Sequence, residues 1–145
     1  MQEYRIVCFE GGECSGKSTL KKLFERETNF RHLCVDRMFI TSIVYNKHKN
    51  RHPELEEKLY KDLDIFIETF NPLFVVLNVD EQERERRFVD RGDWYILQNE
   101  LSSIQSIYDE VLKDLIEQYP ENFLILDNNS KKDQENAIKS IMKVL

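Results

Sequence analysis

The first residues that could do chemistry form a glycine-containing loop, residues 11–18, which reads GGECSGKS. It satisfies G-x-x-x-x-G-K-[ST], the pattern of a phosphate-binding loop that joins a strand to a helix. Its amide N–H groups and the start of the following helix favour phosphate oxygens, so we expect Lys17 to reach the β- and γ-phosphates of a nucleoside triphosphate and Ser18 to bind Mg²⁺. The candidate ATP-binding residues here are Gly11, Gly12, Glu13, Cys14, Ser15, Gly16, Lys17, Ser18 and Thr19.

A second candidate pair, Asp36 and Arg37, follows the apolar run at residues 32–36. If that run is a strand, both side chains open onto the same cleft as the loop. A carboxylate there can hold Mg²⁺ or accept the proton of a hydroxyl group, and a guanidinium can form two hydrogen bonds with a phosphate. The other interpretation is a surface ion pair at a strand end.

Four arginines and five acidic residues are mixed between residues 81 and 93. Arg87 and Arg91 are four residues apart, so they share one face of a helix that Gly92 ends. This spacing predicts a helical lid near residues 81–95 that closes the two arginines over a transferring phosphoryl group. A solvated charged helix is the alternative, and the phosphate-binding loop favours the lid.

The elements that must position these residues follow from the hydrophobic pattern. Short apolar runs predict strands, and apolar positions three or four residues apart predict helices. Strands are expected at residues 4–10, 32–36, 73–80 and 123–127, and helices from residue 17, over 39–47, from 53 to 70, over 81–91 and 101–119, and around 138–142. The alternation predicts an α/β fold of the P-loop NTPase type, with a parallel sheet of about four strands and helices on both faces.

Length and composition set further bounds. The 145 residues suffice for a single domain, 1–145, and the formal net charge of −6 argues against nonspecific binding to nucleic acid. The N-terminus has no signal-peptide layout, and no apolar run approaches the ~20 residues that a membrane-spanning helix needs. We therefore expect a cytoplasmic protein with no membrane association.

These motifs together resemble the thymidylate kinase family and, more broadly, the P-loop nucleoside and nucleoside-monophosphate kinases. Residues 9–19 look like that family's F-E-G-x-[DE]-G-x-G-K-[ST]-T. Residues 36–46 are similar to its D-R-x-x-x-S-S-x-A-Y-Q, and residues 87–92 to the R-x-x-x-R-G of its lid. Residues 126–130 occupy the place of a loop that lies against the ATP adenine in the family.

The resemblance implies roles for individual side chains. Glu13 approaches the sugar hydroxyl of the acceptor, Arg37 holds the acceptor phosphate, and Ser42 and Tyr45 belong to the acceptor site. Asn128 and Asn129 lie at the ATP adenine. The family carries a helping arginine either in the phosphate-binding loop or in the lid; since this loop has Ser15 and no arginine, the lid type is implied, with Arg87 and Arg91.

The sequence also departs from the family pattern. Only residues 28–31 stand where the family inserts a strand and helices that form much of its base pocket and dimer surface. Cys14 replaces a loop glycine, and Trp94 and Tyr95 replace a second D-R pair in the lid. Triphosphate binding is expected despite these losses, whereas thymidylate specificity does not follow.

The sequence therefore predicts an ATP- and Mg²⁺-dependent phosphotransferase, a nucleotide or nucleoside kinase in the form of a reduced deoxynucleoside-monophosphate kinase. Its expected catalytic residues are Lys17, Asp36, Arg37, Arg87 and Arg91, and its expected metal ligands are Ser18 and Asp36. Two alternatives stay open: a kinase of a nucleoside, a polynucleotide end or another small hydroxyl compound, and a non-catalytic ATP-binding module that assists a partner. The sequence leaves a homodimer open.

Overall fold

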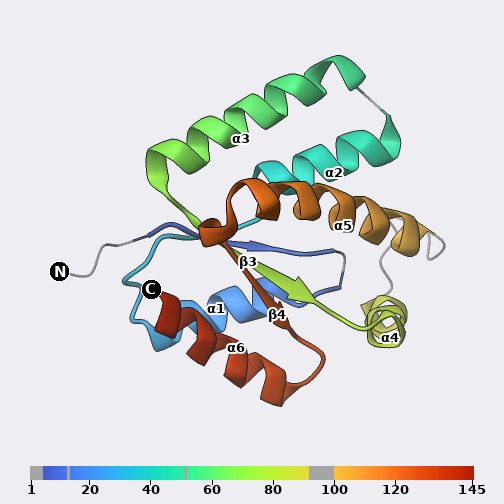
Figure 1. Ribbon diagram of the computed structural model, residues 1–145. Helices are drawn as coiled ribbons and strands as arrows, with labels where there is room; N and C mark the ends of the chain where they lie inside the picture. Colours follow the sequence, from blue (N-terminus) through green and yellow to red (C-terminus); the bar gives the residue numbers. More distant parts are fainter. Residues whose placement is uncertain (1–4, 13, 51, 92–99) are drawn as a thin grey trace.

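The fold is built on a parallel sheet of four strands in the order β2-β1-β3-β4 (Figure 1). The computed structural model describes residues 5–12, 14–50, 52–91 and 100–145. The strands are β1 (Val7–Glu10), β2 (Cys34–Asp36), β3 (Leu73–Asn78) and β4 (Phe123–Asp127). The predicted α/β class is confirmed, and β1, β2 and β3 are shorter than the apolar runs that predicted them.

Helices connect the strands as the sequence pattern predicts. Pro53 begins a short 3-10 turn, η1 (Pro53–Leu55), and the α-helix predicted to start there begins at Glu56. A second 3-10 turn, η3 (Pro120–Asn122), precedes β4. The α-helices are α1 (Lys17–Glu27), α2 (Phe39–Lys49), α3 (Glu56–Phe70), α4 (Glu81–Arg91), α5 (Leu101–Gln118) and α6 (Lys131–Val144). None of the helices in the described residues is long and apolar enough to cross a membrane.

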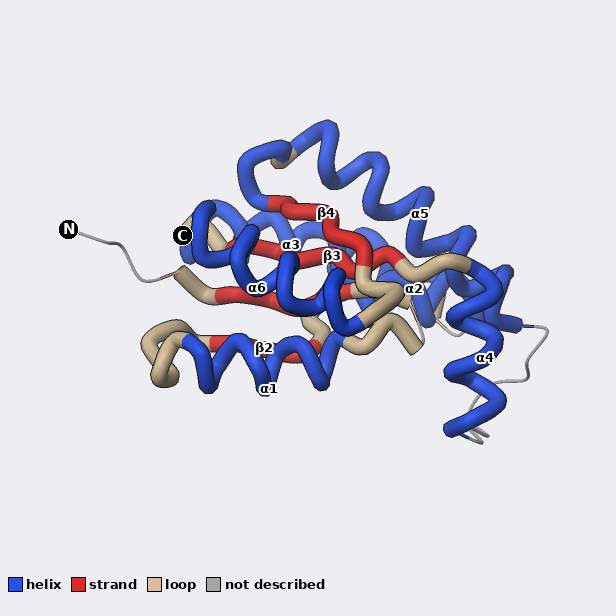
Figure 2. Tube along the Cα trace, turned by 90° about the horizontal axis from the view of Figure 1, so that it is seen from below, coloured by secondary structure: helices blue, strands red, loops and turns tan. Residues whose placement is uncertain are grey.

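Helices cover both faces of the sheet, as Figure 1 and Figure 2 show: α1 and α6 lie on one face, and α2, α3 and α5 on the other. Successive residues of a strand point their side chains to opposite faces of the sheet. Val7 and Phe9 pack in the apolar cluster with α1 and α6, whereas Cys8 packs in the cluster with α2, α3 and α5. The central strands β1 and β3 are therefore buried, with helices on both faces, which suits a parallel sheet.

Register brings the carboxyl ends of the strands to one edge. Phe9 lies opposite Asp36 of β2 and Val75 of β3. The chain leaves β1 at Glu10 for the phosphate-binding loop, and it leaves β2 at Asp36 toward α2. In an open parallel sheet this edge is where ligands bind, so the fold brings the two sequence motifs to the expected place.

Candidate functional site

The phosphate-binding loop connects β1 to α1 and needs glycine at two positions. Gly11 has φ +154, and a Cβ there would lie 2.7 Å from the hydroxyl oxygen of Ser15. Gly16 has φ +80, and a Cβ there would lie 2.6 Å from the side-chain nitrogen of Asn128. Both glycines are thus required by close approach as well as by backbone conformation.

Lys17 is the first residue of α1, and its side chain turns into the loop. It is only 5% exposed, and its ammonium donates a hydrogen bond of 3.3 Å to the carbonyl oxygen of Gly12. A lysine held in this way offers a positive charge beside amide groups, which is the arrangement that receives phosphate. Glu13, expected at the acceptor sugar, lies outside the described residues.

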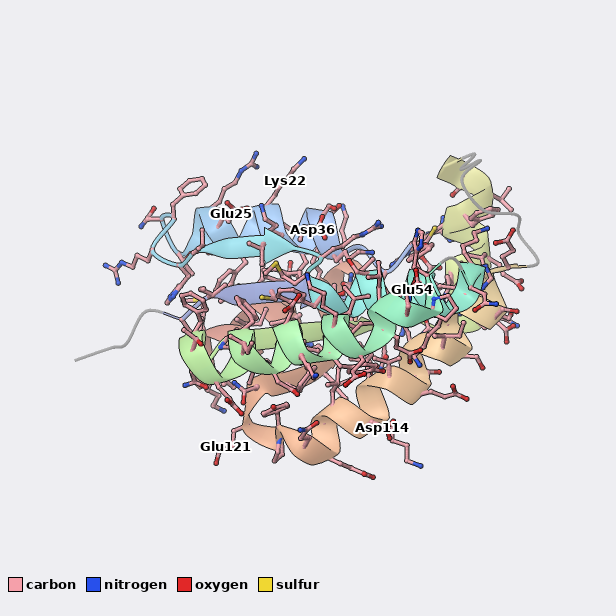
Figure 3. All side chains as sticks on the ribbon, turned by 90° about the horizontal axis from the view of Figure 1, so that it is seen from above. Lys22, Glu25, Asp36, Glu54, Asp114 and Glu121 are labelled. Atoms are coloured by element: carbon pink, nitrogen blue, oxygen red, sulfur yellow. The ribbon has the colours of Figure 1, made fainter. Side chains whose placement is uncertain are left out.

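Ser18 and Asp36 meet across the site. The hydroxyl of Ser18, near the start of α1, donates a hydrogen bond to Asp36 Oδ2 at the end of β2. Figure 3 shows Asp36 at that strand end, beside α1. The other carboxylate oxygen, Asp36 Oδ1, is buried and has no hydrogen-bond partner among the described residues. A buried, unpaired carboxylate oxygen costs free energy, so the pair suits a bound cation or an ordered water.

The two expected metal ligands fit Mg²⁺ on these grounds. Mg²⁺ prefers oxygen ligands and is commonly held by one or two protein groups together with phosphate oxygens and water. No cluster of three or more His, Cys, Asp or Glu side chains that could hold a metal occurs in the parts of the chain that the structure describes. Ser18 and Asp36 would therefore hold the ion jointly with a bound triphosphate, and the ion would neutralise phosphate charge.

Arg37 has a left-handed backbone, φ +69, immediately after β2. Its amide donates to the carbonyl oxygen of Phe9 at 3.1 Å, so the end of β1 holds this conformation. A non-glycine residue in this region is strained and persists only where its surroundings impose the conformation. The side chain of Arg37 is exposed and lines the cleft beside the loop.

Arg87 reaches from α4 to the phosphate-binding loop and lines the same cleft. Its guanidinium donates to the carbonyl oxygens of Cys14 at 3.1 Å and Asn128 at 2.7 Å. Glu83, one turn earlier, accepts a further hydrogen bond of 3.0 Å from Arg87 Nε. The predicted helix over 81–91 is confirmed, and its Arg87 contacts the loop directly. The rest of the predicted lid, residues 92–95, and the side chain of Arg91 lie outside the description.

The connection that follows β4 braces the same loop. Asn128 is 4% exposed, and its side-chain amide donates to the carbonyl oxygen of Ser15 at 2.8 Å. The side-chain oxygen of Asn129 accepts from the amide of Asp80 at 2.7 Å, which ties this segment to the end of β3. Both expected adenine-site residues therefore lie at the cleft, and Asn128 also supports the loop through its side chain.

A cavity of about 650 Å³ joins these parts, in the size range of small-molecule sites. Residues 14–19, Arg37, one face of α4, residues 128–131 and Gln134 form its walls. Neither Ser42 nor Tyr45 lines it: Ser42 is exposed on α2, and Tyr45 is half-buried against the apolar cluster under α2, α3 and α5. The structure thus brings the triphosphate candidates and Arg37 together and leaves these two acceptor candidates apart from them.

Two residues near the loop were not predicted from the sequence. Glu10 is 0% exposed and accepts hydrogen bonds from the amide of Met38 at 2.7 Å and the hydroxyl of Thr41 at 2.9 Å. Burial raises the pKa of Glu10 to about 7, although these two hydrogen bonds lower it. An acidic residue ending an apolar run was the available signal. Gln105 of α5 lies where a side chain at Gly12 would be, and no sequence pattern indicated this contact.

Comparison with known proteins supports the fold. No family model matches the chain, and no curated protein matches it in sequence. The structure is similar to that of the YorR protein of Bacillus subtilis, solved in complex with phosphorylated GDP, with 18% sequence identity and a TM-score of 0.69 over 96% of this chain and 94% of that one. It is also similar to thymidylate kinase from Ehrlichia chaffeensis, with 13% identity and a TM-score of 0.59 over 99% of each chain. The chain therefore has an α/β fold of the P-loop type, shared with these proteins.

Proposed function

We propose that this protein is an ATP- and Mg²⁺-dependent phosphotransferase that acts on a nucleotide, in the manner of a reduced deoxynucleoside-monophosphate kinase. The observation that carries the proposal is the contact between Ser18 and Asp36 beside the buried ammonium of Lys17. Together these side chains provide a magnesium site and a phosphate site at one end of the sheet. The fold similarity to a thymidylate kinase and to a protein solved with phosphorylated GDP supports the same class of ligand.

Catalysis in this proposal depends on placement and charge. Lys17 binds the β- and γ-phosphates, and Ser18 and Asp36 hold the Mg²⁺ that neutralises them. Arg87, which already contacts the loop through Cys14, stabilises charge that spreads over the transferring group. We assign Arg91 the same role in the lid. Such a site needs little covalent participation by the protein, because positioning supplies most of the rate.

Arg37 is the proposed acceptor-binding group. Its exposed guanidinium lies in the same cleft as residues 14–19, so it can hold a second phosphate near the first. A planar guanidinium binds a phosphate dianion through two hydrogen bonds, which fixes both distance and direction. A monophosphate acceptor is therefore the substrate class that the cleft suits best.

The test is a screen of nucleosides and nucleoside monophosphates with γ-labelled ATP and Mg²⁺, with Lys17→Ala as the inactive control. Transfer of label to a monophosphate supports the proposal. Transfer only to hydroxyl groups of nucleosides or polynucleotide ends would replace the acceptor. Tight MgATP binding without transfer to any compound would instead indicate a non-catalytic ATP-binding module.

A further inference from the structure

Glu10 is a buried acid that the proposed chemistry does not use. It ends β1, directly before the phosphate-binding loop, and its carboxylate has no exposure to solvent. Each oxygen has its own donor: the amide of Met38 lies 2.7 Å from Oε1, and the hydroxyl of Thr41 lies 2.9 Å from Oε2. A carboxylate engaged on both oxygens and closed off from solvent cannot contact a substrate, so its role must be exerted through its partners.

Those partners form the start of α2. Met38 is the residue that caps this helix, and its own side chain makes no capping hydrogen bond. Thr41 lies in the first turn of α2. Helix N-termini leave amide groups without partners and favour negative charge, so Glu10 supplies from β1 the cap that α2 lacks.

The same contact lies next to Arg37 in the chain. The amides of Arg37 and Met38 are held by consecutive residues of β1, through the carbonyl oxygen of Phe9 and the carboxylate of Glu10. Arg37 has φ +69 between these two anchors. Because a left-handed non-glycine residue requires surroundings that impose it, loss of the Glu10 contact would let this turn relax and move the Arg37 side chain.

The network extends to α5. Thr41 and the hydroxyl of Tyr108 are 2.9 Å apart. When Glu10 is ionised, the single proton of the Thr41 hydroxyl goes to its carboxylate, so Tyr108 then donates to Thr41. The start of α2 is therefore fixed from β1 and from α5 at once, and both contacts are made by buried or half-buried groups.

We propose that Glu10 is the positioning residue of the acceptor site: its carboxylate, supported by Thr41 and Tyr108, holds the left-handed turn that directs Arg37 toward the acceptor phosphate. This inference rests on the proposed function of Arg37. It assigns the placement of Arg37 to three side chains that do not themselves line the cavity.

The test compares three variants by steady-state kinetics on the monophosphate acceptor found in the screen. Glu10→Met keeps the side-chain length but removes both carboxylate oxygens. We expect it to raise the KM for the monophosphate by about tenfold or more while changing the KM for ATP less than about threefold. Glu10→Gln retains an oxygen for Met38 and should stay within about threefold of the parent protein. Thr41→Val, which removes one donor and keeps the shape, should fall between them.

Two further measurements separate positioning from general destabilisation. Leu63→Ala, in the buried part of α3, is the matched control: it lowers the melting temperature and should leave the ratio of the two KM values unchanged. Hydrogen exchange, measured at a temperature where the variants are folded, should show the Met38 amide losing protection in Glu10→Met and keeping it in Glu10→Gln, while the amides of α3 stay protected in both.

The outcomes distinguish the inference from the proposed function. If the parent protein phosphorylates monophosphates but Glu10→Met changes both KM values equally, or Glu10→Gln behaves like Glu10→Met, Glu10 does not position Arg37 through its oxygen atoms and the inference is overturned alone. If the parent protein phosphorylates no monophosphate, the proposed function fails and this inference fails with it. A selective rise in acceptor KM with rescue by Glu10→Gln supports both.

Discussion

The hydroxyl of Ser18 donates to the carboxylate of Asp36, which joins the first turn of α1 to the end of β2. Two residues 18 positions apart in the sequence thus occupy one point of the site. The second oxygen of Asp36 is buried and unpaired within the described residues, so the pair has spare capacity for a ligand. Ser18 and Asp36 would hold a Mg²⁺ ion that arrives with a triphosphate, and the ion would neutralise phosphate charge.

Lys17 gives the first prediction. Lys17→Ala should reduce phosphoryl transfer on the order of a hundredfold or more and weaken MgATP binding, because it removes the ammonium that lies inside the loop. Circular dichroism should show a folded protein. Lys22→Ala, which removes an exposed lysine from the same helix, is the matched control and should keep full activity. Unchanged turnover in Lys17→Ala would refute the site.

The parts of this architecture that were predictable have a local or topological cause. The loop motif has fixed spacing, and its strand and helix follow from hydrophobic period, so β1, the loop and α1 were evident. Asp36 near Ser18 followed from topology, because the carboxyl ends of parallel strands share an edge. The prediction that α3 begins at Pro53 is wrong, because the fixed φ and missing N–H of proline also suit a 3-10 turn just before the helix.

The parts that were not predictable depend on long-range packing. Arg87 donates to main-chain carbonyl oxygens of Cys14 and Asn128, which are 73 and 41 positions away in the sequence. Every residue has a main-chain carbonyl, so the sequence does not indicate which ones will accept these bonds. The burial of Glu10 depends on where α2 begins relative to β1, and periodicity alone treats an acid at a strand end as solvated.

Arg87 gives the second prediction. Arg87→Ala should lower kcat by tenfold to a thousandfold, on the order of the loss when one preorganised donor is removed, and should raise the KM for ATP less. Arg87→Lys should not restore the rate, because an ammonium cannot reproduce the fork that reaches both Cys14 and Asn128. Arg26→Ala, at an exposed arginine of α1, serves as control. Small and equal changes in both constants would show that Arg87 supports the loop without stabilising the transferring group.

Glu10 gives the third prediction, a pH dependence of stability. Its pKa is about 7 in the folded protein against 4.5 for an ordinary glutamate, because burial disfavours the charged form. Between these values the folded protein keeps a proton that the unfolded chain has lost, so this group lowers the free energy of unfolding as pH rises through the window, by about 3 kcal/mol at most. Below pH 4.5 and above pH 7 the contribution is constant.

Glu10→Gln removes this titration while keeping the shape of the side chain. The difference in melting temperature between Glu10→Gln and the parent protein should therefore shift in favour of the variant as pH rises from about 4.5 to 7, and then level off. Thermal unfolding without nucleotide, in buffers of constant ionic strength, measures it. A difference that stays constant across the range would show that Glu10 titrates at its ordinary pKa.

Asp36 and Arg37 together decide the class of acceptor. A monophosphate acceptor is a dianion that must be held close to the charge of ATP, and a guanidinium can do this. A hydroxyl acceptor must instead lose a proton, and the carboxylate would accept it. If the acceptor is a monophosphate, Arg37→Ala should raise its KM on the order of tenfold or more, and Arg37→Lys should not restore it because the two-pronged contact is lost. Steady-state kinetics at saturating MgATP measure this. If Arg37→Ala barely changes acceptor affinity while Asp36→Asn abolishes transfer without releasing Mg²⁺, the acceptor is a hydroxyl compound and Asp36 is its base.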